Sequence, residues 1–180
     1  LRGSKWNLYE AGLRVPWIIR WPGRVRAGTT RSETFIGTDL LPTLSAAAGA
    51  PLPAGVPLDG HDVLPLWLGR PSAAASARAF TWHFPYYHPE GSAYAKARPT
   101  IGVDDLAVSQ TQPQSAIRVG DWKLIHFYAD NRDELHRLSS DPSEQRDLAA
   151  SEPTRARALR AQLEAELRAA HARIPTPATP

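Results

Sequence analysis

The chain has 180 residues, of which 42% are hydrophobic and 22% are charged, a balance that supports a buried core and argues against disorder. Its 21 Lys and Arg residues exceed its 18 Asp and Glu residues by a net charge of +3, and they form no dense basic block, so nucleic-acid binding has little support. The absence of cysteine excludes disulfides, thiolate metal sites and a Cys nucleophile within these residues.

Strand and helix signals alternate in the first part of the chain. Residues 15–21 form a short apolar run that ends at Pro22-Gly23, which predicts a buried strand. Residues 40–48 predict a helix, with Thr38 or Asp39 as the N-cap and Gly49 at the end. A second short helix is expected over residues 63–69. The turn residues Asp59, His61 and Asp62 are expected to be solvated.

The second part has the pattern of an antiparallel sheet followed by a long helix. Residues 79–84 alternate as a strand does, and residues 116–119 and 122–127 flank a two-residue turn, which predicts a hairpin. Residues 133–138 are a further candidate strand. Residues 152–172 predict a helix because leucines recur four apart on one face. We expect Ser151 to cap this helix, and His126, His136 and His171 to lie at surface or edge positions.

Residues 85–114 show no sustained period and predict a long loop. With this loop, the elements divide into residues 1–78, which look like pieces of an α/β sheet, and residues 79–180, which look like a small antiparallel sheet with one long helix. The fold class is therefore α/β with a small α+β domain at the C-terminal end.

Several sequence blocks, taken together and in order, resemble the sulfatase family. Residues 3–16 read Gly-Ser-Lys-Trp-Asn-Leu-Tyr-Glu-Ala-Gly-Leu-Arg-Val-Pro, which is similar to the family signature Gly-x-Lys-x-x-x-Tyr-Glu-Gly-Gly-x-Arg-x-Pro. The Asp-Leu-Leu-Pro-Thr, Leu-Asp-Gly, Ile-Arg-x-Gly-Asp-x-Lys-Leu and Asp-Pro-x-Glu blocks of that family also have matches here, within 39–43, 58–60, 117–124 and 141–144.

The resemblance implies the C-terminal part of an alkaline-phosphatase-like sheet in residues 1–78 and the small C-terminal domain in residues 79–180. It implies a bacterial-type sulfatase that hydrolyses sulfate esters of carbohydrates or aryl compounds. It further implies a formylglycine nucleophile and a calcium ion, both in an upstream part of the same protein. We therefore expect this chain alone to be inactive, and the full-length protein to be periplasmic or secreted. Asp104-Asp105 is interpreted as a pair of loop carboxylates rather than calcium ligands.

Lys5 is the residue that the resemblance assigns to sulfate contact, since an ammonium group can neutralise charge on sulfate oxygens. Tyr9, Glu10 and Arg14 are expected to support the Lys5 segment without touching substrate, and Glu10 and Arg14 can form an ion pair. Ala11 replaces the usual Gly of the signature, which puts the local backbone in doubt if that position needs a positive φ.

His83, Tyr86 and His88 are candidate substrate-binding residues because aromatic and imidazole groups suit sugar stacking and hydrogen bonding. A strand-end packing cluster explains them equally well. No metal ligand is assigned to this chain, because His83 and His88 lack a third ligand at suitable spacing.

Two alternatives stay open from the sequence. A phosphoester or phosphonate hydrolase of the same superfamily would share the scaffold and differ in the upstream nucleophile. A catalytically inert sulfatase remnant or interaction module would expose apolar strand edges. Neither alternative implies nucleic acid or a membrane span as a partner.

Overall fold

A computed structural model describes residues 1–3, 7–72, 78–86 and 112–176. The chain divides into two compact units: Leu1–Val15 with Ala79–Pro180, and Pro16–Arg78. Residues 1–3 and 7–15, which the sequence pattern assigned to the first part of the chain, thus belong to the unit of the C-terminal sheet. No helix among the described residues is long and apolar enough to cross a bilayer.

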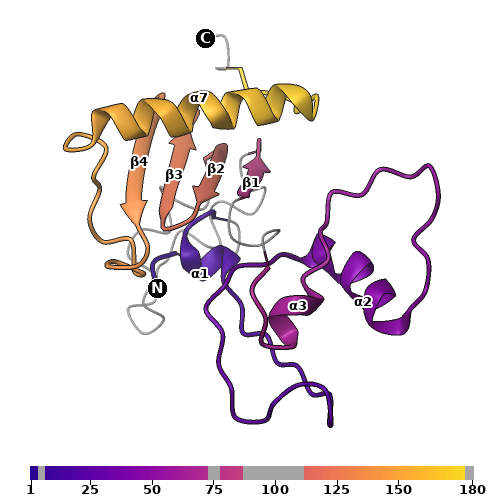
Figure 1. Ribbon diagram of the computed structural model, residues 1–180. Helices are drawn as coiled ribbons and strands as arrows, with labels where there is room; N and C mark the ends of the chain where they lie inside the picture. Colours follow the sequence, from indigo (N-terminus) through magenta and orange to yellow (C-terminus); the bar gives the residue numbers. More distant parts are fainter. Residues whose placement is uncertain (4–6, 73–77, 87–111, 177–180) are drawn as a thin grey trace, which may run out of the picture. The chain divides into compact units, whose positions relative to one another are not determined.

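The first unit is built on a four-stranded antiparallel sheet in the order β1-β2-β3-β4. Its strands are β1 Ala79–Phe84, β2 Gln114–Val119, β3 Trp122–Phe127 and β4 Arg132–Arg137. β2 and β3 form the predicted hairpin, with Val119 opposite Trp122 and Gly120 at a φ of 58°, a conformation that suits glycine. Figure 1 shows the four strands side by side.

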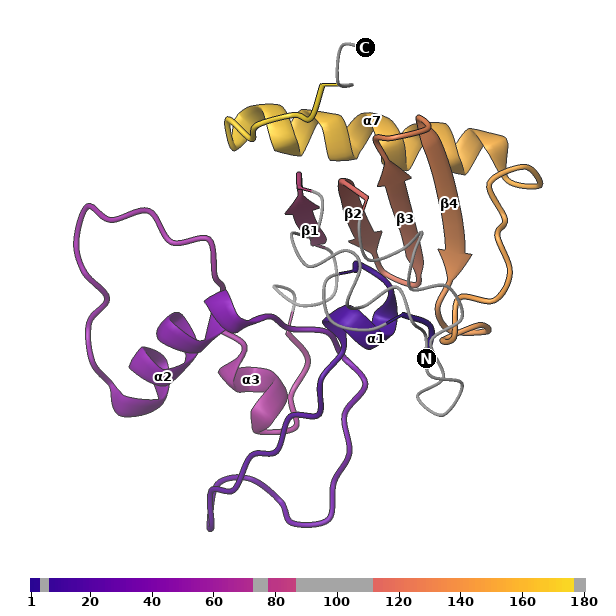
Figure 2. The ribbon, with the colours of Figure 1, turned by 180° about the vertical axis from the view of Figure 1, so that it is seen from behind.

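Helix α7, Pro153–Ala169, covers one face of this sheet and contacts all four strands. Figure 2 shows it from the opposite side, running along the whole sheet. The predicted leucine face is confirmed: Leu159, Leu163 and Leu167 are buried against Ile117 and Leu124. Since residues i and i+4 lie on one side of a helix, the leucine spacing of the sequence fixes which side is buried.

The other face of the sheet is covered by the N-terminal segment. Residues Glu10–Leu13 form one helical turn, α1. Leu8 and Tyr9, just before it, are buried with Ala116, Ile125 and Phe127 of the sheet. Each strand therefore alternates between a side chain under α7 and a side chain under the N-terminal segment.

The second unit contains the 3₁₀ turn η1 Gly37–Asp39, helix α2 Leu40–Ala48 and helix α3 Leu64–Trp67. Asp39 is its central polar residue, with no exposed surface. Its carboxylate accepts hydrogen bonds from the backbone of Ile36 and His61, each at 3.0 Å, and pairs with the Arg78 guanidinium. Gly49 ends α2 at a φ of 65°, as predicted.

The prediction of a buried strand over residues 15–21 is wrong for the structure as described. These residues have no regular secondary structure, and Ile18 is 89% exposed. The run has strand composition, but a strand also needs a neighbour for its backbone groups. Among the described residues, every strand belongs to the sheet of the first unit.

The predicted cap of α7 is wrong, and that of α2 is right in position only. The N-cap of α7 is Glu152, and no side chain caps this end, because the Ser151 hydroxyl donates to the Leu148 carbonyl instead, at 3.1 Å. Asp39 is the N-cap residue of α2, as one of the two predicted alternatives, but its side chain makes no capping bond, because its carboxylate accepts from the backbone of Ile36 and His61. The competing bond of Ser151 is local, to a carbonyl three residues back, whereas Asp39 also accepts from His61, which is 22 residues away.

Candidate functional site

Lys5, the residue assigned to sulfate contact, lies outside the described residues, and so does His88. The residues on both sides of Lys5 are described and lie close together. A Cβ placed on Gly3, whose φ is 85°, would stand 2.3 Å from Asn7 Oδ1. Asn7 Oδ1 in turn accepts a hydrogen bond from the Tyr9 backbone at 3.2 Å. Only glycine at position 3 therefore permits this close approach.

The substitution of the signature glycine by Ala11 is accommodated. Ala11 lies in α1, and it is not among the described residues with a positive φ. Its N–H donates to the Arg2 carbonyl at 3.0 Å. A helical backbone suits alanine well, so the reason to doubt the local backbone disappears.

Tyr9 connects the N-terminal segment to β4 through a buried hydrogen bond. Its hydroxyl donates to Glu134 Oε2 at 2.7 Å, and Arg2 lies 3.1 Å from the same oxygen. Burial alone would raise the pKa of Glu134, but hydrogen bonds from His136, Tyr9 and Arg132 outweigh it and lower the pKa to about 2. Burial and the Glu134 charge raise the pKa of Tyr9. The pair is therefore a neutral phenol donating to a carboxylate.

Glu10 connects the segment to β3 through a buried lysine. Lys123 has no exposed surface, and its Nζ lies 3.0 Å from Glu10 Oε1 and 2.9 Å from Glu144 Oε1. The Glu10 N–H donates to the other oxygen of Glu144 at 2.5 Å. The predicted pair of Glu10 with Arg14 is also present, at 3.9 Å. Burial raises the pKa of Glu144, and the Lys123 charge opposes the rise.

The remaining candidates lie at the end of β1. The His83 ring bonds to the Ser115 hydroxyl at 2.6 Å and to the Arg173 carbonyl at 2.9 Å, so both ring nitrogens contact protein groups. Tyr86 is 57% exposed and packs edge-on against Phe84. The structure thus places a packing contact at His83 and an open aromatic face at Tyr86.

The expectation of surface or edge positions is wrong for His126, and for His136 it holds only in that β4 is an edge strand. His136 is fully buried and His126 is 2% exposed. The His136 ring bonds to Glu134 at 3.2 Å, and the His126 ring bonds to Asp133 at 2.8 Å. The partner of His126 lies across the sheet on β4, so it gives no local signal, whereas Glu134 stands two residues before His136 on the same strand.

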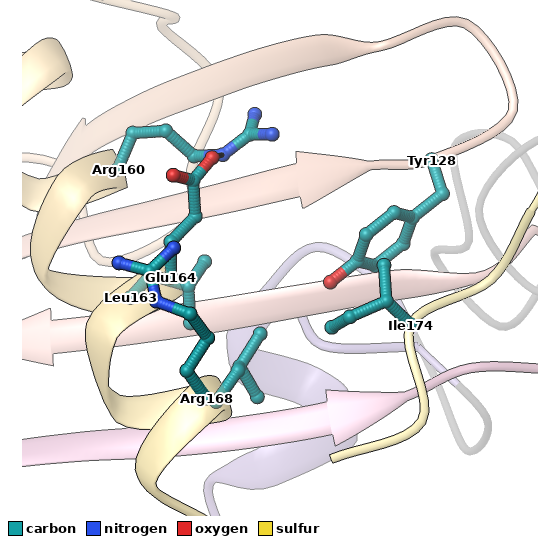
Figure 3. Close-up of a pocket in the computed structure, with 7 residues that line it drawn as sticks. Tyr128, Arg160, Leu163, Glu164, Arg168 and Ile174 are labelled. Atoms are coloured by element: carbon teal, nitrogen blue, oxygen red, sulfur yellow. Dashed lines mark hydrogen bonds and ion pairs between the residues drawn. The ribbon is translucent and has the colours of Figure 1, made fainter. Parts of the chain in front are cut away.

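A pocket of about 210 Å³ opens beside α7. In Figure 3, Arg160, Glu164 and Arg168 project from α7, opposite Tyr128 and Ile174. Arg160 is held by Asp133 at 2.9 Å and by Glu164 at 2.8 Å, and the Tyr128 hydroxyl lies 2.9 Å from that of Ser115. Most polar groups of this pocket are thus engaged within the protein, and sequence reasoning did not single it out.

A further segment of the chain matches a sulfatase motif. Ser151-Glu152-Pro153-Thr154-Arg155 fits the Cys/Ser-x-Pro/Ala-x-Arg spacing of a formylglycine motif. In the structure Ser151 bonds to a turn carbonyl, and the Arg155 guanidinium stacks 4.3 Å above the Trp122 ring. No group of three His, Cys, Asp or Glu among the described residues is placed to hold a metal. These residues therefore do not fit a calcium-dependent centre, and the segment serves as the start of α7.

The fold and these blocks define a class of protein. The profile of the N-sulphoglucosamine sulphohydrolase C-terminal family matches residues 4–173. The chain therefore belongs to the sulfatase family and corresponds to the C-terminal region of a sulfatase.

Individual relatives agree with this assignment. The chain is 28% identical to an N-acetylgalactosamine-6-O-sulfatase of Bacteroides thetaiotaomicron over 91% of its own length and 29% of that protein. It is 46% identical to human arylsulfatase A over 50% of its length and 17% of that protein. It spans only 14% of the human steryl-sulfatase. The chain thus covers less than a third of each of these proteins.

Solved structures show the same fold. A Bacteroides thetaiotaomicron protein of a locus for glycosaminoglycan metabolism matches 91% of the chain and 31% of its own length, with a TM-score of 0.63 and 26% identity. A second protein, solved with its substrate D-glucosamine-2-N,6-O-disulfate, matches 84% of the chain and 27% of its own length, with a TM-score of 0.60 and 26% identity.

Proposed function

We propose that residues 1–180 form the C-terminal portion of a sulfuric ester hydrolase that acts on sulfated carbohydrates. The observation that carries the proposal is the family match over residues 4–173. The choice of carbohydrate rests on two relatives whose names state a sulfated sugar, an N-acetylgalactosamine-6-O-sulfatase and the protein bound to D-glucosamine-2-N,6-O-disulfate.

In this proposal Lys5 contacts the sulfate group, and its ammonium stabilises charge on the sulfate oxygens as the ester bond breaks. The described residues support this role indirectly. Gly3 and Asn7 approach each other on either side of Lys5, and Tyr9 and Glu10 are bonded to the sheet. In the sugar subsite of this proposal, Tyr86 offers a ring face and His88 is the second candidate, while His83, whose ring nitrogens are both bonded within the protein, contributes only ring contact.

The nucleophile and the calcium ligands belong, in this proposal, to a preceding part of the same protein. When bound, calcium neutralises charge at the sulfate. We expect that protein to reach the periplasm or the exterior of the cell, where sulfated glycans occur. Residues 1–180 alone are then expected to show no turnover of a sulfate ester.

The experiment is to express the gene with its upstream coding sequence and to assay 4-nitrophenyl sulfate and 6-O-sulfated amino sugars. Lys5→Ala should lower kcat/KM by roughly 100-fold or more, since it removes a charge aimed at the reacting group. Arg157→Ala, an exposed site on α7, is the control and should not change the rate. Hydrolysis of phosphonate esters with no hydrolysis of sulfate esters would overturn the proposal.

A further inference from the structure

The most unusual polar feature of the chain is the buried lysine of β3. Lys123 is fully buried, and its ammonium lies between two carboxylates from distant parts of the chain, Glu10 and Glu144. Lysine is almost never fully buried unless paired. The sheet therefore holds a cation whose partner on one side belongs to α1.

The second carboxylate belongs to a residue with an uncommon backbone conformation. Glu144 has a φ of 53°, in the left-handed region that a non-glycine residue rarely adopts. Such a conformation persists only where surrounding contacts fix it. Here the contacts are Lys123 and the Glu10 N–H, which donates to Glu144 at 2.5 Å. Glu10 thus meets the sheet with both its side chain and its backbone.

Further contacts keep the same segment in register. The Leu8 N–H donates to Gln114 Oε1 at 3.0 Å, and the Tyr9 hydroxyl donates to Glu134 at 2.7 Å. The bonds run from consecutive residues of the segment to β2, β3 and β4. A shift of α1 along the sheet would therefore break several buried bonds together.

We propose that Lys123 is a positioning residue of the sulfate site, which holds α1 at one register on the sheet and thereby fixes the segment that carries Lys5. The effect of Lys123 on catalysis rests on the proposed function, because it requires that the longer protein hydrolyse sulfate esters. Lys123 does not touch substrate. It acts through Glu10. Glu10 lies three residues after Asn7, and Asn7 is the first described residue after Lys5.

The test compares Lys123→Met with Leu124→Ala. Leu124 is the next residue of the same strand, but it packs in the α7 cluster on the opposite face. Leu124→Ala therefore destabilises the sheet without touching α1. The first measurement is amide hydrogen exchange of the 180-residue chain at Leu8 and Glu10, with the two variants brought to equal unfolding free energy by urea.

Lys123→Met should speed exchange at these two amides about tenfold or more relative to Leu124→Ala. The second measurement is kcat/KM for a sulfate ester in the longer protein. Lys123→Met should lower it by about 10- to 100-fold relative to Leu124→Ala, since small displacements of a positioning segment cost rate on this scale. If Lys123→Met does not fold, Glu10→Gln removes only the α1 side of the contact and is measured in the same way.

The outcomes separate the two proposals. Equal exchange in the two variants would show that Lys123 does not hold α1 and would overturn the inference. Faster exchange with equal kcat/KM would overturn the positioning role in catalysis. A longer wild-type protein that hydrolyses no sulfate ester would overturn the proposed function, and the hydrogen exchange would still decide whether Lys123 holds α1.

Discussion

Glu134 shows how one carboxylate concentrates the polar contacts of a sheet face. It lies in β4 and is 5% exposed, yet its oxygens meet Tyr9, Arg2, Arg132 and His136. Removing a water-exposed carboxylate from solvent is costly unless donors replace the water. Here the donors come from β4 itself and from the N-terminal segment, so the charge is retained in the folded state.

The pH dependence of stability follows from this carboxylate. Its pKa falls from an ordinary 4.5 to about 2 on folding. The stabilisation is therefore complete above about pH 5 and is lost as the pH falls from 4.5 toward 2, and it corresponds to about 3 kcal/mol. Glu134→Gln should lower the unfolding free energy by about 2–3 kcal/mol at pH 7, with a smaller difference at pH 3. Urea unfolding at the two pH values measures this.

The control for that measurement is Glu164→Gln. Glu164 pairs with Arg160 at (i, i+4) spacing, but its side chain is 46% exposed, and exposed pairs contribute little. It should change stability by less than about 0.5 kcal/mol at either pH. A Glu134 variant that behaves like this control would contradict the role assigned to the buried carboxylate.

At the scale of elements, α7 is the largest contributor to the core of the first unit. Leu163 is 1% exposed and packs with Ile117, Leu124 and Leu135. Leu163→Ala should lower the unfolding free energy by about 2–5 kcal/mol because it leaves a cavity under the helix. Arg157→Ala, on the exposed side of the same helix, should change it by less than about 0.5 kcal/mol. Urea unfolding followed by circular dichroism tests both, and equal effects would contradict this packing.

The elements predicted correctly from sequence are those whose signals are local. The hairpin around Gly120 and the leucine face of α7 need only neighbouring residues to be recognised. Residues 15–21 carry an equally clear strand composition, but no partner strand exists for them in the described structure. Pairing is a property of two segments, so composition alone did not decide it.

The residues of the candidate site also divide into those that local sequence predicts and those that it does not. The signature at residues 3–16 was readable, and so was the Glu10–Arg14 pair, since its (i, i+4) spacing is local. Lys123, Glu134 and Glu144 were not singled out, because the contacts that join them to Tyr9 and Glu10 each span more than a hundred positions. The one sequence signal for these contacts was Lys123 itself, a lysine at a strand position that faces inward.

At the scale of the whole chain, the first unit is assembled from segments far apart in sequence. Leu8 and Tyr9 complete the core over Ala116, Ile125 and Phe127, with the second unit, Pro16–Arg78, inserted between the two segments. Contacts of such long range carry a larger loop-closure cost than the pairing of neighbouring strands. We therefore expect the N-terminal segment to pack onto the sheet after the sheet has formed. Helix α7 follows the sheet directly in sequence and can pack on it earlier.

Removal of residues 1–13 tests this division of roles. The truncation uncovers the apolar face around Ile125 and Phe127 and removes the Glu10 partner of Lys123, which lies on the same face of β3. Each large buried side chain contributes about 1.5–3 kcal/mol, so losing Leu8 and Tyr9 together with the ion pair should cost at least about 4 kcal/mol, a large part of a domain's usual stability. We expect a lower urea midpoint and binding of the dye ANS.

The control is Arg14→Ala in the chain of residues 1–180. This variant should bind no dye, because the Arg14 side chain is 57% exposed. A truncated chain with an unchanged midpoint would mean that the sheet and α7 are stable without their cover.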